Sequence, residues 1–194
     1  MRSSYTQNNY GDVLRAIAYS ARPRLAVELG VLDGYSTVHI GHGLREVRRL
    51  GGGGRLDAYD LFDEYAFKHG SYDSVKGEVL TAGLSDVVEI HRGDAYQVHS
   101  RYQPREVGML HVDISNTGET VRRILELWDD KIDTGGVVCF EGGTEERDRV
   151  EWMVKYGKPP IKAEIEGNPI IEKKYVAATY LPFPGLTVLL KKND

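Results

Sequence analysis

Acidic side chains stand at or just after the ends of successive apolar, strand-like runs of this chain. Glu28, Asp60, Asp94, Asp113 and Glu141 occupy these positions in order. Parallel strands end at the same edge of a sheet, and open α/β sheets bind their ligands at that edge. Because carboxylate oxygens accept hydrogen bonds from hydroxyl and amino groups, we expect these side chains to gather around one polar ligand.

The first of these positions carries a glycine-containing turn, Glu28-Leu29-Gly30-Val31-Leu32-Asp33-Gly34, and a helical pattern follows at once from Ser36. Gly30 and Gly34 would let the backbone turn tightly and approach a ligand closely. The free amides at the start of the helix attract a carboxylate, and Glu28 could receive a cation. The same spacing also serves plain chain reversal, which remains the alternative interpretation.

Short apolar runs rich in β-branched residues alternate with segments of helical period, the pattern of a parallel sheet covered by helices. Helices are expected from Asp12, which would act as the cap, and from Ser36, Ser71 and Thr144, the last with Val150, Met153 and Val154 facing inward. Strands are expected over 24–29, 55–59, 87–91, 107–112, a run after Gly135-Gly136, 175–179 and 186–190.

These elements predict a doubly wound, mostly parallel seven-stranded sheet whose last two strands form an antiparallel pair. We expect one domain over residues 1–194, with an N-terminal helix and lid over 1–23 and a core over 24–194. Tyr5, Tyr10 and the 65–72 segment are candidates for lids over the site.

Composition narrows the range of partners. The formal net charge is −4 and the basic residues are scattered, which does not favour a nucleic-acid partner. No apolar stretch is long enough to span a bilayer, so we expect no membrane partner. Cys139 is the only cysteine, which excludes an intrachain disulfide and fits a reducing cytoplasm. We therefore expect a cytoplasmic protein with a small-molecule partner, and association into a homo-oligomer is left open.

The glycine turn and the carboxylates that follow it resemble the class I S-adenosylmethionine-dependent methyltransferases over about residues 24–139. The resemblance implies a Rossmann-like fold and S-adenosylmethionine as cofactor. It places Asp60 on the ribose hydroxyls and Asp94 on the adenine amino group. The other cofactor-binding residues that it implies are Glu28, Gly30, Asp33, Gly34, Ser36, Leu61, Ala95 and Asp113. Asp57 and Asp63 are competitors for the role of Asp60, and we assign them to solvated surface positions.

The ends of the fourth and fifth strands resemble those of catechol and natural-product O-methyltransferases. In that family two acidic residues here hold a divalent cation such as magnesium, and the resemblance makes Asp113 and Glu141 the candidate catalytic residues. Gly142 stands where the family often has another oxygen ligand, so the metal is left open. Asn116 stands near the family's histidine base and cannot accept a proton near neutral pH. His111 should share a strand face with Asp113 and could orient its carboxylate.

The sequence thus favours O-methylation of a small hydroxylated metabolite, with Asp113 and Glu141 near the acceptor. One alternative is a protein that binds S-adenosylmethionine without transferring its methyl group, suggested by the altered metal and base positions. Another is a nicotinamide-dependent oxidoreductase. The turn after the first strand lacks the middle glycine of that fingerprint, so we rank this class lower.

Overall fold

A single seven-stranded sheet organises the chain. The computed structural model describes residues 1–193 and orders the strands β3-β2-β1-β4-β5-β7-β6. Strands β1 to β5 run parallel, whereas β7 pairs antiparallel with both β5 and β6, which confirms the predicted fold class. The strands are β1 (Leu25–Leu29), β2 (Arg55–Asp60), β3 (Val88–Arg92), β4 (Val107–Val112), β5 (Ile132–Glu141), β6 (Tyr175–Tyr180) and β7 (Leu186–Lys191).

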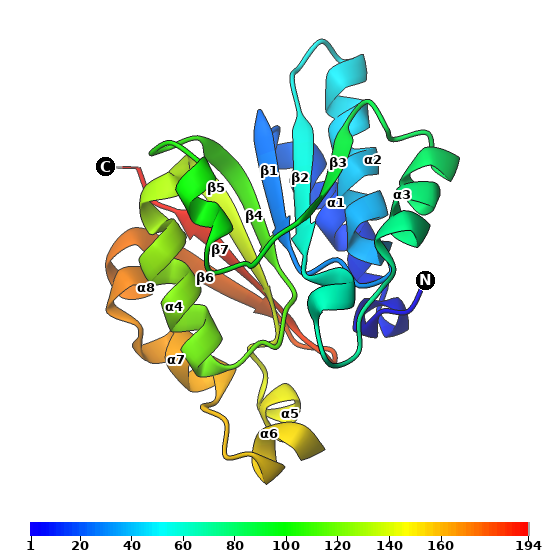
Figure 1. Ribbon diagram of the computed structural model, residues 1–194. Coiled ribbons are helices and arrows are strands. Elements are labelled where there is room, and N and C mark those ends of the chain that lie inside the picture. Colours follow the sequence, from blue (N-terminus) through cyan, green and yellow to red (C-terminus); the bar gives the residue numbers. More distant parts are fainter. Residues whose placement is uncertain (194) are drawn as a thin grey trace.

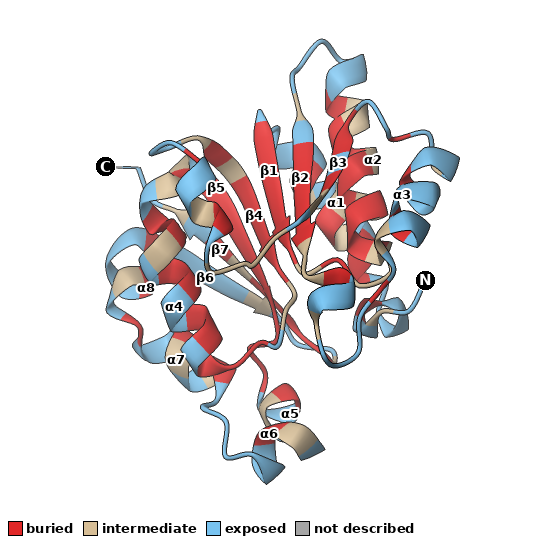
Figure 2. Cartoon of the chain, viewed as in Figure 1, coloured by how far each residue is buried: buried red, intermediate tan, exposed pale blue. Residues whose placement is uncertain are grey.

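Helices cover both faces of the sheet (Figure 1). One layer contains α1 (Tyr10–Ala21), α2 (Tyr35–Arg49) and α3 (Tyr72–Thr81), and the other contains α4 (Gly118–Trp128), α7 (Ile161–Gly167) and α8 (Pro169–Lys174). Each layer buries its own apolar cluster against the sheet, so the central strands are buried on both sides (Figure 2). Burial on both sides explains why β1, β4 and the second half of β5 read as nearly continuous apolar runs.

The strand order reverses between β1 and β4. The chain leaves β1 toward α2 on one face and leaves β4 toward α4 on the other, so the two connections diverge and open a crevice at the carboxyl edge of the sheet. Two short helices, α5 (Glu145–Asp148) and α6 (Glu151–Lys155), extend beyond this same edge (Figure 1).

Several local predictions differ from the structure. Asp12 does not cap α1, which begins after Asn9 in a left-handed conformation, and Asp12 lies in the first turn instead. Thr144 does cap a helix, accepting from the amide of Arg147, but that helix ends at Asp148 and α6 starts separately. Met153 of α6 is buried as predicted, whereas Val154 is exposed. Helices α7 and α8 were not predicted, and β5 begins before the glycine pair expected to precede it.

The tyrosines proposed as lids behave differently from one another. Tyr5, in the short 3-10 helix η1 (Ser4–Gln7), and Tyr10 are both buried in the core and therefore are not surface lids. Tyr65 follows a second 3-10 helix, η2 (Phe62–Glu64), and its hydroxyl lies 3.0 Å from that of Ser115 beyond β4. Among residues 1–193, no helix combines the length and the apolar character needed to cross a membrane.

Gly30 permits the closest approach between the β1 and β4 connections. Its φ is +93°, and a Cβ at this position would lie 2.1 Å from the carbonyl oxygen of Asp113. We expect Gly30→Ala to lower the free energy of unfolding by at least about 2 kcal/mol, from backbone strain and this overlap.

Gly77→Ala is the matched control, because Gly77 lies inside α3 with open space around its Cβ position. It should stabilise the protein by up to about 1 kcal/mol, the helix-propensity difference between the two residues. Urea denaturation of both variants measures the two effects. Equal stability of Gly30→Ala and the parent protein would contradict the assigned close approach.

Candidate functional site

A cavity of about 370 Å³ opens at the carboxyl edge of the sheet, where the β1 and β4 connections diverge. Its volume lies in the range of small-molecule sites. The predicted cofactor-binding residues that line it are Gly30, Asp60, Leu61, Asp94, Ala95 and Asp113. Further lining residues that the sequence did not single out for the site are Leu32, Tyr59, Gly93, Tyr96, Ile114 and Ser115, whereas Tyr65 and Lys68 belong to the proposed lid segment.

Asp60 fixes the glycine turn as well as lining the cavity. Its Oδ2 accepts from the backbone amides of Val31 and Leu32 at 2.8 and 3.0 Å, and its Oδ1 accepts from the amide of Phe62 at 2.8 Å. These three amides occupy three of the roughly four lone-pair sites of the carboxylate, so Oδ1 retains capacity for one ligand hydroxyl. Asp60 therefore joins the ends of β1 and β2 and presents a rigid acceptor to the cavity.

Asp94 begins the turn that follows β3. Its Oδ1 accepts from the amide of Tyr96 at 2.9 Å and its Oδ2 from the side chain of Gln97 at 3.0 Å. These bonds stabilise the turn after Gly93, and both Asp94 and Ala95 still face the cavity. Asp94 can therefore stabilise the turn and still contact a ligand in the cavity.

Glu28, which the sequence predicts to bind the cofactor, does not lie on the cavity surface. Its side chain is fully buried and lies outside the cavity lining. It accepts from the hydroxyl of Thr37 and from Nδ1 of His111, the latter at 3.0 Å. Because a carboxylate only accepts, His111 donates through Nδ1, and in the neutral ring Nε2 accepts from the hydroxyl of Tyr5 at 3.1 Å. His111 therefore orients Glu28, and both of its ring nitrogens are occupied away from Asp113.

Three other predicted cofactor-binding residues also lie outside the cavity lining. Asp33 forms an ion pair with Arg2, 2.7 Å from Nε, and the hydrogen bonds from Arg2 lower the pKa of Asp33 to about 2. Gly34, with φ of +85°, is the residue before α2, and Ser36 is buried in the first turn of that helix. Gly34 and Ser36 therefore shape the turn and the start of α2, and Asp33 connects the turn to the N-terminal segment. None of the three forms part of the cavity surface.

Asp113 is the acidic group that links the cavity to the protein interior. It is half-buried, and its amide donates to the carbonyl of Leu29 at 2.8 Å. Burial, together with the charges of Glu141 and Glu28, raises the pKa of Asp113 to about 7, although His111 and Arg147 oppose the shift. A carboxyl group that titrates near neutrality can take up or release a proton at working pH.

Glu141 does not share the cavity surface with Asp113. It is 4% exposed, and its Oε1 accepts from Nε of Arg147 at 2.7 Å, so the two residues form a buried ion pair. Burial raises the pKa of Glu141, and the hydrogen bond and charge of Arg147 oppose this. Sequence reasoning missed Arg147, although its position six residues after Glu141 in a short capped helix is a usable signal.

These residues do not fit the divalent cation of the O-methyltransferases that the sequence resembles. The guanidinium group of Arg147 already neutralises Glu141 and repels a second cation. Gly142 supplies no side-chain oxygen, and Asn116 uses its amide nitrogen on the carbonyls of Val112 and Glu141. Among these positions, only Asp113 would offer a cation a carboxylate that is not already paired with a positive charge.

Outside the cavity lining, Asp57 is buried in β2 rather than solvated as predicted, and it accepts from the hydroxyl of Tyr102 at 3.1 Å. Asp57, Glu89 and His91 offer ligand atoms within 4.8 Å of one another. Asp63 is exposed and pairs with Arg92 at 3.1 Å, in agreement with a surface role.

The titration of Asp113 has a measurable effect on stability. Its pKa is raised in the folded state, so the folded protein holds this proton more tightly than the unfolded chain, and the contribution of Asp113 to stability falls as pH rises from about 4 to about 7. Asp113→Asn removes this term. Relative to the parent protein, the variant should gain stability over that window, by at most about 4 kcal/mol, and the difference should level off above it. Urea denaturation at a series of pH values measures the difference, and a pH-independent difference would contradict the assignment.

Solved structures share this fold at low sequence identity. An O-methyltransferase of tomaymycin synthesis from Streptomyces achromogenes, solved with S-adenosylmethionine, is 17% identical with a TM-score of 0.69, covering 99% of this chain and 82% of that one. An O-methyltransferase from Bacillus cereus is 19% identical with a TM-score of 0.67, covering 98% and 83%. A methyltransferase from Geobacter sulfurreducens is 13% identical with a TM-score of 0.68, covering 96% and 79%.

No curated protein matches the sequence. A family model described as a methyltransferase domain matches residues 27–141, from the first strand through the end of β5, which is more than half of the chain. This range contains the glycine turn and every residue that lines the cavity. The chain therefore belongs to the methyltransferase-domain family.

Proposed function

We propose that this protein is an S-adenosylmethionine-dependent O-methyltransferase acting on a small hydroxylated metabolite. The observation that carries the proposal is the convergence of Asp60, Asp94 and Asp113 on one cavity at the strand-order reversal. The Streptomyces and Bacillus enzymes, solved with S-adenosylmethionine and with its demethylated product, are O-methyltransferases of the same fold.

The cavity residues divide naturally between the parts of the cofactor. Asp60 would accept from a ribose hydroxyl through Oδ1, and Asp94 with Ala95 would contact the adenine ring. Gly30 lets the backbone approach the remainder of the cofactor, and Leu61 adds an apolar contact. When bound, the cofactor supplies an activated methyl group on a sulfonium centre. Asp113 lies between these positions and the interior acidic groups, on the side that we assign to the acceptor.

Two other functions receive less support. Membership in the methyltransferase-domain family disfavours a nicotinamide-dependent oxidoreductase, whose glycine fingerprint the turn also lacks. A protein that binds the cofactor without methyl transfer would share the cavity but show no turnover.

Incubation with radiolabelled S-adenosylmethionine and a panel of phenols, sugars and carboxylic acids separates these functions. We expect label transfer to at least one hydroxylated compound; binding without any transfer would support the non-catalytic alternative.

The assigned role of Asp60 has its own test. Asp60→Ala should weaken binding of S-adenosylhomocysteine by about 1 to 3 kcal/mol, because a charged acceptor for the ribose and the clamp on the glycine turn are both lost. Asp63→Ala is the matched control, since Asp63 is an exposed aspartate three residues later that pairs with Arg92. Isothermal titration calorimetry measures both. An unchanged affinity in Asp60→Ala would assign the ribose contact to another residue.

A further inference from the structure

Three buried polar atoms at the ends of β4 and β5 have no hydrogen-bond partner. They are Oδ1 of Asn116, Oε2 of Glu141 and Nη1 of Arg147, and their residues are at most 7% exposed. An unsatisfied buried polar group costs about 1 to 3 kcal/mol, so native proteins rarely leave several together. Two acceptors and one donor without partners therefore indicate a polar group that binds among them.

The contacts of these side chains bring the three residues together in one patch. Arg147 reaches Glu141 through Nε alone, at 2.7 Å, which leaves the second carboxylate oxygen and the outer guanidinium nitrogen unused. Asn116 is fixed by donating from Nδ2 to the backbone carbonyl of Glu141 at 3.1 Å and to that of Val112 at 3.0 Å. These two bonds fix the amide group, and its acceptor Oδ1 keeps both lone pairs unused.

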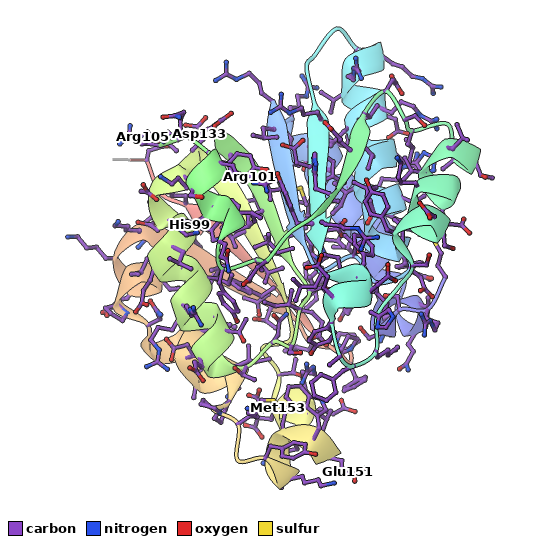
Figure 3. All side chains as sticks on the ribbon, viewed as in Figure 1. His99, Arg101, Arg105, Asp133, Glu151 and Met153 are labelled. Carbon is purple, nitrogen blue, oxygen red and sulfur yellow. The ribbon has the colours of Figure 1, made fainter. Side chains whose placement is uncertain are left out.

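This patch adjoins the cavity described above. Asp113, Ile114 and Ser115 form one wall of the cavity, and Asn116 is the next residue along the chain. The charges of Glu141 and Arg147 both act on Asp113. Trp152 of α6 lies against the patch, with its ring centroid 5.3 Å from Cζ of Arg147, while Met153 of the same helix is buried and Glu151 is exposed (Figure 3).

We propose that Glu141 and Arg147, with Asn116 beside them, form the subsite for the acceptor hydroxyl of the proposed methyl transfer. A hydroxyl group both donates and accepts, which matches the unused atoms. It donates to Oε2 of Glu141 and accepts from Nη1 of Arg147. The inference rests on the proposed function and identifies how a hydroxylated acceptor is recognised.

The subsite also assigns the proton and the charge of the reaction. As the acceptor oxygen forms its bond to the methyl carbon, the carbon–sulfur bond breaks with its electron pair going to sulfur, and the hydroxyl proton passes to Oε2 of Glu141. Arg147 donates to the oxygen while negative charge develops on it, the electrostatic role that a divalent cation has in the resembling O-methyltransferases. A buried arginine thus takes the place of the metal.

The test uses protein loaded with S-adenosylhomocysteine in the presence of EDTA, with 4-nitrophenol as probe and 4-nitrotoluene as its counterpart without the hydroxyl. Calorimetry should show 4-nitrophenol binding at least about tenfold more tightly. Arg147→Met should remove most of this preference, and Arg147→Lys should retain part of it because a charged donor remains. Magnesium should leave the affinity unchanged.

The controls separate the subsite from general damage. Arg149→Met changes an exposed arginine that pairs with Glu145, and it should bind both probes as the parent protein does. The double variant Glu141→Gln with Arg147→Met leaves no unpaired buried charge, so loss of the preference there cannot be attributed to unfolding. S-adenosylhomocysteine affinity should stay within about twofold in every variant, since none of these residues lines the cavity.

Three results would overturn the inference. The first is equal affinity for the two probes in the parent protein, the result expected if the three atoms bind only an ordered water. The second is an unchanged preference for 4-nitrophenol in the double variant. The third is a preference that requires magnesium. Each of these leaves S-adenosylhomocysteine binding intact, whereas failure of the proposed function itself would appear as no binding of S-adenosylhomocysteine by the parent protein.

Discussion

The buried carboxylate of Glu28 is the interaction on which the site geometry depends. A charge without solvent must be satisfied by hydrogen bonds, and Glu28 takes them from Thr37 in α2 and His111 in β4. The other ring nitrogen of His111 is hydrogen-bonded to the hydroxyl of Tyr5 in the N-terminal segment. One carboxylate therefore fixes the direction in which α2 leaves β1, the alignment of β1 with β4 and the position of residues near the N-terminus. The cavity opens where these constrained connections diverge.

The order of elements could be predicted because both faces of the sheet are covered. Strands buried on both sides appear as apolar runs of five or six residues, and the helices between them keep one apolar stripe, so neither needs tertiary information to be recognised. The segment after α6 is different. Helices α7 and α8 are six or seven residues long and bury chiefly Ile161, Ile165 and Ile171, which is too little periodicity to distinguish them from a loop.

Within the site, the sequence predicted which residues lie at the carboxyl edge of the sheet better than it predicted the side chains with which they interact. Asp60, Asp94 and Asp113 line the cavity because each stands at a strand end or within two residues of it, and backbone topology alone places them at the same edge. Glu28 and Glu141 also stand at strand ends, yet they face inward. Their orientation depends on His111 and Arg147. His111 supplies a hydrogen bond from the neighbouring strand β4, which is distant in sequence, and Arg147 supplies a compensating charge from α5, the helix after β5. No pattern local to Glu28 indicates its partner, whereas Arg147 stands six residues after Glu141 in a short helix that Thr144 caps.

The balance of charge at this edge explains why Asp113 stands apart from the other two acids. Glu28 is satisfied by hydrogen bonds and Glu141 by a full positive charge, whereas Asp113 faces both of their carboxylates and the cavity. Its raised pKa expresses the cost of a third negative charge there. A cationic ligand in the cavity would lower that cost, and the sulfonium of the proposed cofactor is cationic while its demethylated product is not. By linkage, ionised Asp113 then favours the methyl donor over the product, and protonation of Asp113 weakens that preference.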